Sequence, residues 1–461
     1  MSVVGACMVP HPPVIVPEVG RGEERRIAET TAAYRKAADF VRELAPETIV
    51  LSSPHSVMYA DYFHVSPGRR ASGDLGRFRA GGVRIDASYD EAFTALLEEK
   101  AERLHFPAGT MGERDSSLDH GTIVPLYFIN QAYTDYRLVR VGLSGLSLAD
   151  HYRFGQLIAE TADALDRRVV FIASGDLSHK MQADGPYGFD PAGPVYDELI
   201  LKDAAEGRFG RFLDYDEAFL EKAAECGHRS FCIMAGALDG CAAECRVLSH
   251  TGELGVGYGV AAFRVTGPDP ERHFLKKWEE KEAERRKNER ASEDPYVRLA
   301  RAAVEAYVLH HRRISLPDGL PEEMTGRRAG VFVSLHEEGQ LRGCIGTISP
   351  TRPSVAAEIA ENALSAASRD PRFSPVRRGE LDRLEISVDV LGATEPVSSV
   401  RELDPERYGV VVTAGERRGL LLPDLEGVDT PERQIAIAKR KAGIGEGEAV
   451  TLERFEVVRH R

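Results

Sequence analysis

The chain has 461 residues, of which 43% are hydrophobic and 29% charged, and its formal net charge is −14. This length exceeds what one hydrophobic core usually organises, so we expect two domains. The acidic balance disfavours nucleic-acid binding by the N-terminal part, because a nucleic-acid-binding domain usually carries a basic face.

Apolar runs and cysteines bear on the compartment. No run of about 18 apolar residues is present, and the apolar N-terminus has no basic leader, so neither a membrane span nor a signal peptide is expected. The six scattered cysteines fit a reducing compartment. The sequence therefore predicts a cytoplasmic protein.

Up to about residue 268, the chain alternates between β-branched apolar runs and segments of helical composition. This alternation predicts an α/β domain with a mostly parallel central sheet and helices on both faces. Strands are expected at residues 3–9, 48–52, 136–143, 169–173 and 257–265, and helices at 23–44, 87–104, 150–165, 195–205, 216–224 and 231–243. Residues 56–84 and 180–194 are expected to be loops at the rim of a pocket.

A segment dense in charges of both signs, residues 276–294, separates two blocks of different composition. We interpret 1–268 as one domain, 269–293 as a charged linker and 294–461 as a smaller α+β domain, since its elements do not alternate regularly. In the second domain, strands are expected at residues 330–335, 340–348, 384–391 and 409–413, and helices at 295–311, 354–368 and 431–442.

Three histidines follow predicted strands of the first domain within a few residues: His11, His55 and His179. The carboxyl ends of parallel strands share one edge of a sheet, so these imidazoles should converge there. They could bind a metal ion or move a proton. Glu225 and Cys226 offer a third ligand: two histidines and a carboxylate form the facial triad typical of Fe(II) oxygenases, whereas a thiolate favours a softer site.

A set of short motifs in residues 1–266 resembles the LigB-type class III extradiol ring-cleavage dioxygenases and the related MEMO proteins. The resemblance implies that His11 and His55 are metal ligands and that His179 is the acid/base residue. It favours Glu225 as the third ligand, with Cys226 as the alternative, because MEMO-type proteins use a cysteine there. The motifs are Pro10-His11-Pro12, Ser53-Pro54-His55, Asp119-His120-Gly121-Thr122, Val124-Pro125-Leu126 and Ser174-Gly175-Asp176-Leu177-Ser178-His179.

The resemblance also implies an activity. Fe(II), or alternatively zinc or copper, would bind a small catechol-like aromatic substrate, with dioxygen as the co-substrate. His120 would lie near that substrate, and Asp176 would either orient His179 or cap a turn. The alternative is a MEMO-like protein that binds iron or copper for redox or metal handling without ring cleavage. A scaffold without chemistry is the third possibility.

Two groups of cysteines need separate interpretation. Cys241 and Cys245 are expected to be buried thiols one turn apart on a helix. Cys344 lies in a glycine-rich strand and is interpreted as structural rather than nucleophilic. The turn at 370–373 carries charges that could pair locally.

Motifs of the second domain closely resemble the AMMECR family over residues 294–461. A LigB-type domain fused ahead of an AMMECR domain resembles protein A of the AmmeMemoRadiSam system. This likeness implies radical SAM and MEMO-like proteins as partners. The motifs are Leu341-Arg342-Gly343-Cys344-Ile345-Gly346-Thr347, Asp370-Pro371-Arg372-Phe373, Gly419-Leu420-Leu421-Leu422-Pro423 and Lys441-Ala442-Gly443.

Overall fold

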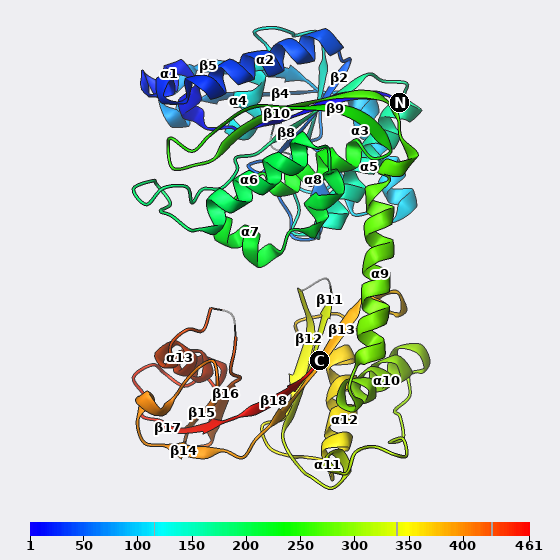
Figure 1. Ribbon diagram of the computed structural model, residues 1–461, viewed down its shortest axis with the longest axis vertical. Helices are drawn as coiled ribbons and strands as arrows, with labels where there is room; N and C mark the ends of the chain where they lie inside the picture. The colour runs from blue at the N-terminus through cyan, green and yellow to red at the C-terminus, as the bar shows by residue number, and fades with distance from the viewer. Residues whose placement is uncertain (115, 338–339, 426) are drawn as a thin grey trace. The chain divides into compact units, whose positions relative to one another are not determined.

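The computed structural model describes residues 1–114, 116–337, 340–425 and 427–461. The chain forms two compact units, Met1–Lys281 and Glu282–Arg461. Their boundary lies within the charged segment predicted as a linker, which forms one helix, α9 (Phe274–Ser292) (Figure 1). Leu275 of α9 is buried in the core of the first unit, and Arg290 donates a hydrogen bond to the Leu381 carbonyl of the second.

A six-stranded sheet forms the centre of the first unit, with the strand order β7-β2-β8-β1-β10-β9. The first four strands are parallel, and β10 and β9 add an antiparallel edge. The mostly parallel sheet expected from the sequence is therefore present. The strands are β1 (Val3–Val9), β2 (Thr48–Ser53), β7 (Arg137–Gly142), β8 (Val169–Ser174), β9 (Cys241–Thr251) and β10 (Tyr258–Pro268).

Helices cover both faces of this sheet (Figure 1). α2 and α4 pack on one face, and α3, α5, α6 and α8 pack on the other. None of the helices in the described ranges is long and apolar enough to cross a membrane. The helices of this unit are α1 (Pro17–Gly20), α2 (Ala28–Leu44), α3 (Glu91–Leu104), α4 (His120–Ile129), α5 (Leu148–Ala164), α6 (Ala192–Ala205), α7 (Glu217–Ala223) and α8 (His228–Ala237).

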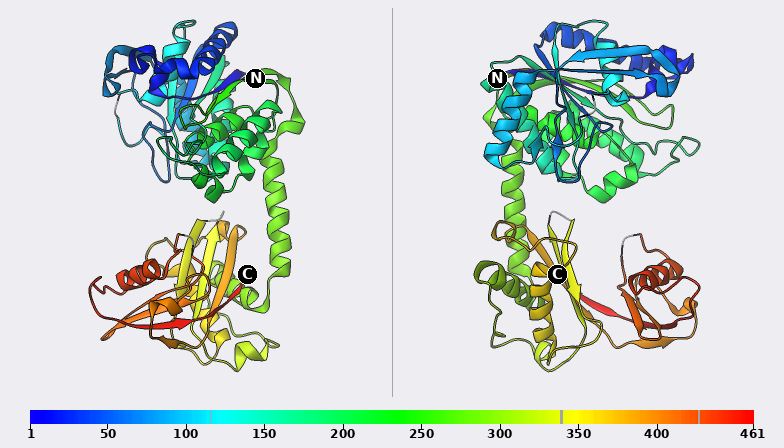
Figure 2. Two further views of the ribbon diagram at one scale, coloured as in Figure 1. Left: turned by 60° about the vertical axis from the view of Figure 1, so that its left-hand side comes forward. Right: turned by 180° about the vertical axis from the view of Figure 1, so that it is seen from behind.

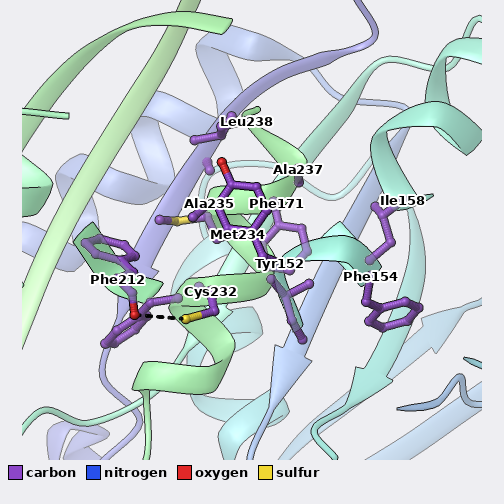
Figure 3. Close-up of a cluster of buried hydrophobic side chains, with 14 of the residues drawn as sticks. Tyr152, Phe154, Ile158, Phe171, Phe212, Cys232, Met234, Ala235, Ala237 and Leu238 are labelled. Atoms are coloured by element: carbon purple, nitrogen blue, oxygen red, sulfur yellow. Dashed lines mark hydrogen bonds between the residues drawn. The ribbon is translucent and has the colours of Figure 1, made fainter. Parts of the chain in front are cut away.

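The alternating side chains of each central strand enter two different cores. Phe171 of β8 packs with the α5 and α8 side chains (Figure 3), whereas its neighbours Val170 and Ile172 join the core beneath α2 and α4. A strand buried on both faces needs apolar residues at successive positions, which is why these strands appear as continuous apolar runs in the sequence.

Two predictions for the first unit are wrong. The helix predicted at 231–243 ends at Ala237, and Gly240 turns the chain with a φ of 70°, so that Cys241 and Cys245 lie on strand β9 and not on a helix. The segment 56–84, predicted as a loop, contains paired strands. These strands are β3 (Phe63–His64), which pairs with β6 (Ala108–Gly109), and β4 (Arg70–Leu75), which pairs with β5 (Ala80–Ser88).

The second unit is α+β, as predicted, with two four-stranded sheets. The orders are β12-β11-β13-β18 and β14-β17-β15-β16, and α10 and α12 lie against one face of the first sheet (Figure 2). The strands are β11 (Val331–Glu337), β12 (Gln340–Gly346), β13 (Leu384–Leu391), β14 (Glu395–Val397), β15 (Gly409–Ala414), β16 (Arg417–Leu421), β17 (Thr451–Phe455) and β18 (Val457–His460). The helices are α10 (Pro295–His310), α11 (Glu322–Thr325), α12 (Val355–Ser368) and α13 (Pro431–Lys441).

The contact between α5 and α8 gives a first prediction. A Cβ at Gly155 would lie 1.9 Å from the Ile233 carbonyl oxygen, so Gly155→Ala must push the two helices apart. We expect it to lower the free energy of unfolding of the first unit by about 1–3 kcal/mol, the usual cost of overpacking. Urea denaturation measures the change. Gly82→Ala in β5 is the control, since a Cβ at that position would have no other atom within 4 Å; equal effects of the two substitutions would contradict the prediction.

Candidate metal centre

The carboxyl ends of β1, β2 and β8 meet at one edge of the sheet because the three strands are parallel. His11 follows β1, His55 follows β2, and His179 follows β8. The segment before α8 brings Cys226 to the same place. Two groups of potential ligand atoms result, each within 4.8 Å: His11, His55 and Cys226, and Asp176, His179 and Cys226.

The His11 ring is fixed in one tautomer by its hydrogen bonds. Its Nδ1 lies 3.0 Å from Ser174 Oγ, and that hydroxyl donates its hydrogen to the Gly121 carbonyl at 2.6 Å. Ser174 can therefore only accept from His11, so Nδ1 carries the proton and Nε2 presents its lone pair. Histidine ligands of metals are typically held in this way, with the second ring nitrogen donating to a neighbouring group.

The His11 Nε2 atom faces two further atoms that could act as metal ligands. His55 Nε2 lies 3.0 Å away, and Cys226 Sγ lies 3.7 Å away. A buried imidazole, a half-buried thiol and a more exposed imidazole thus converge on one point. Two nitrogens and a sulfur fit a transition-metal ion such as iron, copper or zinc.

The structure places Cys226, and not the favoured Glu225, with the two imidazoles. The Glu225 carboxylate instead accepts the backbone N–H of His228, the first residue of α8, at 2.5 Å. This carboxylate therefore caps the helix and stabilises its positive end. Burial raises the pKa of Glu225 to about 7, against the effect of these backbone N–H groups. The preference for Glu225 as third ligand is thus not supported by the geometry.

Asp176 positions the backbone of His11. Its Oδ1 accepts the backbone N–H of His11 at 2.8 Å, and its own N–H donates to Cys226 Sγ at 3.3 Å. Within the ranges that the structure describes, Asp176 makes no hydrogen bond to the His179 ring, which stacks on Tyr187 with a centroid distance of 4.9 Å. Asp176 and His179 nevertheless lie close together, with ligand atoms within 4.8 Å of each other, so the role of Asp176 toward His179 stays a prediction.

Burial controls the charge of this cluster. It lowers the pKa of His11 to about 3, with a further contribution from the neighbouring His55, and it lowers the pKa of His179. It raises the pKa of Asp176 to about 6 and that of the Cys226 thiol well above its usual range. At neutral pH His11 is thus a neutral imidazole and Cys226 a thiol, and binding a cation would release the thiol proton.

His120 opens the site toward a cavity. As the first residue of α4, it follows Asp119, whose carboxylate caps the helix and also accepts from Ser53. The His120 ring lies 4.0 Å from the His55 ring, and burial lowers its pKa to about 4. Both rings line a cavity of about 510 Å³.

Several residues of this cavity were not found by the sequence analysis. Arg77, Phe78 and Arg84 come from the β4–β5 hairpin, and the buried Arg140 comes from β7. This hairpin segment was expected to be a loop at the rim of the pocket, because it is so polar that its sequence did not indicate two paired strands or their register. In the sequence, the one signal was that the charged residue Arg140 interrupts an apolar strand. In the structure, Arg140 forms an ion pair with Asp119 at 3.7 Å.

Comparisons with known proteins bear on both units. The family model described as the catalytic LigB subunit of aromatic ring-opening dioxygenase matches residues 5–261, and the AMMECR1 model matches 297–460. Protein CA_C1420 of Clostridium acetobutylicum is 41% identical over the whole of both chains. A Thermotoga maritima protein is 53% identical over 37% of this chain and 98% of its own.

Two solved structures are also similar to parts of the chain. PH0010 from Pyrococcus horikoshii is 32% identical, with a TM-score of 0.34, over 36% of this chain and 88% of its own. JW3007 from Escherichia coli is 15% identical, with a TM-score of 0.37, over 56% of this chain and 99% of its own.

The ligand geometry yields a prediction on metal content. Cys226→Ala should lose most of the metal that the wild-type protein retains, because it removes one of the three convergent donor atoms. Glu225→Gln is the matched control: it alters the adjacent residue, keeps an oxygen acceptor for the His228 N–H, and should retain the metal. Elemental analysis of protein purified without added metal measures both. Loss of metal in Glu225→Gln together with retention in Cys226→Ala would reverse the assignment.

Proposed function

The chain belongs to the LigB family of aromatic ring-opening dioxygenase subunits and carries an AMMECR1 domain, and on this basis we propose that its first unit is a metal-dependent oxidoreductase acting on a small aromatic compound. The observation that carries this proposal is the convergence of His11 Nε2, His55 Nε2 and Cys226 Sγ. These residues would hold one iron or copper ion, and the ion would supply Lewis acidity and a redox couple.

The cavity beside His55 and His120 supports an aromatic substrate. Its volume of about 510 Å³ falls within the range of small-molecule pockets. Phe78 and His120, whose ring centroids are 5.4 Å apart, offer ring surfaces for stacking. In the proposal, a catechol-like ring enters here with its hydroxyl groups toward His55.

His179 is proposed as the group that moves a proton. Burial lowers its pKa, so it is a neutral base at neutral pH. It shares Cys226 as a neighbour with the proposed ligands, and it is not needed to complete the set of His11, His55 and Cys226. It can therefore accept a phenolic proton and later return one to the product.

A second candidate function is redox or metal handling without ring cleavage. It is favoured by Cys226, because the ring-cleaving facial triad uses a carboxylate, whereas a thiolate suits softer ions such as Cu(I). The two candidates differ in oxygen consumption. Protein loaded anaerobically with Fe(II) should consume dioxygen with at least one member of a catechol panel if it is a dioxygenase, and with none if it handles metal only.

We also propose partners on the strength of the fused arrangement. A radical SAM protein and a MEMO-like protein would bind this chain, and affinity capture with the full-length protein, against each purified candidate, tests the association. Absence of binding to both would remove this part of the proposal.

The role of His179 predicts a separation of binding from turnover. His179→Ala should keep the metal content of the wild type and lose about 10²–10⁴-fold in rate, the usual contribution of a positioned acid or base. His11→Ala should lose the metal itself. Oxygen-electrode rates and elemental analysis on the same samples measure the two effects. If His179→Ala loses its metal, His179 is a ligand and the proposed division of roles is wrong.

A further inference from the structure

The second unit contains a cavity of about 880 Å³ that shares no residue with the candidate metal centre. It borders the face of the β11–β13 sheet that α10 and α12 do not cover. Val333 and Leu335 of β11 pack in the core beneath these helices, whereas Ser334 and His336 line the cavity. A sheet face that carries polar side chains beside a cavity of this size is typical of a ligand site.

Cys344 lies on the wall of this cavity. It pairs across the strands with Ser334, which in turn pairs with Ser387, so three small polar side chains form a row over β12, β11 and β13. The Ser334 hydroxyl donates to Cys344 Sγ at 3.3 Å. The glycine-rich motif that surrounds Cys344 thus contributes to a site, in addition to any structural role.

The turn after α12 pins the backbone of Cys344. Asp370 Oδ2 accepts the Cys344 N–H at 2.8 Å, and Arg372 donates to the Cys344 carbonyl at 3.2 Å. Asp370 and Arg372 also form an ion pair at 2.7 Å, which confirms the local pairing expected for this turn. Both backbone groups of Cys344, on the edge strand β12, are therefore satisfied by this turn.

The lining of the cavity is strongly cationic. Eight arginine or lysine residues and four acidic residues line it, an excess of four positive charges in a protein whose net charge is −14. Most of the cations pair with carboxylates, as Arg301 does with Glu293 and Arg459 with Asp389. Over the described part of the chain, the lining residues Arg286, Lys441 and Arg461 form no ion pair, and Lys441 lies within electrostatic range of Cys344.

The remaining walls are apolar. Phe332, Leu341, Leu420 and Leu422 line the cavity from β11, β12, β16 and the residue after β16. Unpaired cations beside apolar walls would bind a ligand that has an anionic group on an apolar body. The anionic group would then pair with the cations, and the apolar body would leave water to contact the apolar walls.

From these observations we propose that the cavity of the second unit binds a small organic anion, a phosphate or carboxylate on an apolar body, with Lys441 as the cation and Cys344 in contact with the ligand. This site is independent of the metal centre and of the activity proposed for the first unit. It assigns a ligand class to the AMMECR1 domain.

Alkylation of Cys344 tests the proposal with the full-length protein. Iodoacetate is an anion and iodoacetamide is its neutral analogue, and peptide mass spectrometry follows Cys344 separately from the other five cysteines. For each thiol, we compare the rate of alkylation by iodoacetate with the rate of alkylation by iodoacetamide. At low ionic strength, this ratio should be about tenfold higher at Cys344 than for the free, neutral thiol N-acetylcysteine amide, because a cleft lined by one sign of charge concentrates the oppositely charged reagent.

Two substitutions and three competing small molecules test what causes a preference of Cys344 for iodoacetate. Lys441→Gln should lower the ratio about threefold. Arg440→Gln removes the same charge from the neighbouring position on α13, does not line the cavity, and should leave the ratio unchanged. Phenyl phosphate or benzoate should slow the alkylation of Cys344, and the uncharged benzyl alcohol should not. The anion that protects Cys344 at the lower concentration shows whether the ligand carries a phosphate or a carboxylate.

Three results would overturn the proposal: a ratio equal to that of the free thiol, equal effects of Lys441→Gln and Arg440→Gln, or equal protection by benzyl alcohol and the anions. Failure of both reagents to modify Cys344 would overturn it as well, since the thiol would then not be reachable from the cavity.

Discussion

Two glycines in contact hold the candidate metal centre together. A Cβ on Gly175, just after β8, would lie 2.1 Å from the Cα of Gly227, just before α8. No other residue allows these two loops to approach so closely. Their contact places the Asp176 N–H 3.3 Å from Cys226 Sγ, and that sulfur 3.7 Å from His11 Nε2. A side chain at either glycine would separate the thiol from the imidazoles.

The polar groups around this contact support one another. His11 is held at its ring by Ser174 and at its backbone by Asp176, while Ser53 joins the His55 loop to Asp119 at the start of α4. These hydrogen bonds are buried or half-buried, where an unsatisfied partner is costly, so each one restricts its neighbours. The His11 imidazole is thus held in place by protein groups before any metal ion enters.

The sequence predicted the elements that depend on local patterns and missed those that depend on packing. The apolar runs before His11, His55 and His179 sufficed to predict parallel strands that end at one edge, because burial on both faces leaves a continuous signal. The hairpin with Arg77 and Phe78 has no such signal. Strand β9, which begins at Cys241, starts only a few residues after helix α8 ends. Both elements contain alanines, so in the sequence they appeared as one helical segment.

The choice between Glu225 and Cys226 shows where sequence reasoning ends. The two residues are adjacent, and composition gives no reason to prefer either as a ligand. What decides between them is the start of α8: because the helix begins at His228, the carboxylate of Glu225 is positioned to accept the N–H of that residue. The neighbouring side chain, Cys226, then points to the other side of the chain, toward His11. The position of one helix terminus thus places a thiol, and not a carboxylate, beside the two imidazoles.

Both units use a carboxylate to fix the backbone of a chemically important residue, but the two carboxylates differ in charge state. Asp176 accepts the N–H of His11, and its burial raises its pKa to about 6. Asp370 accepts the N–H of Cys344, and its hydrogen bonds to Arg372 lower its pKa to about 2. As the pH falls through 6, Asp176 takes up a proton and its charge-assisted hydrogen bond weakens, whereas Asp370 stays ionised. The hydrogen bond that positions the His11 backbone should therefore weaken in mild acid, whereas the one that positions the Cys344 backbone should persist.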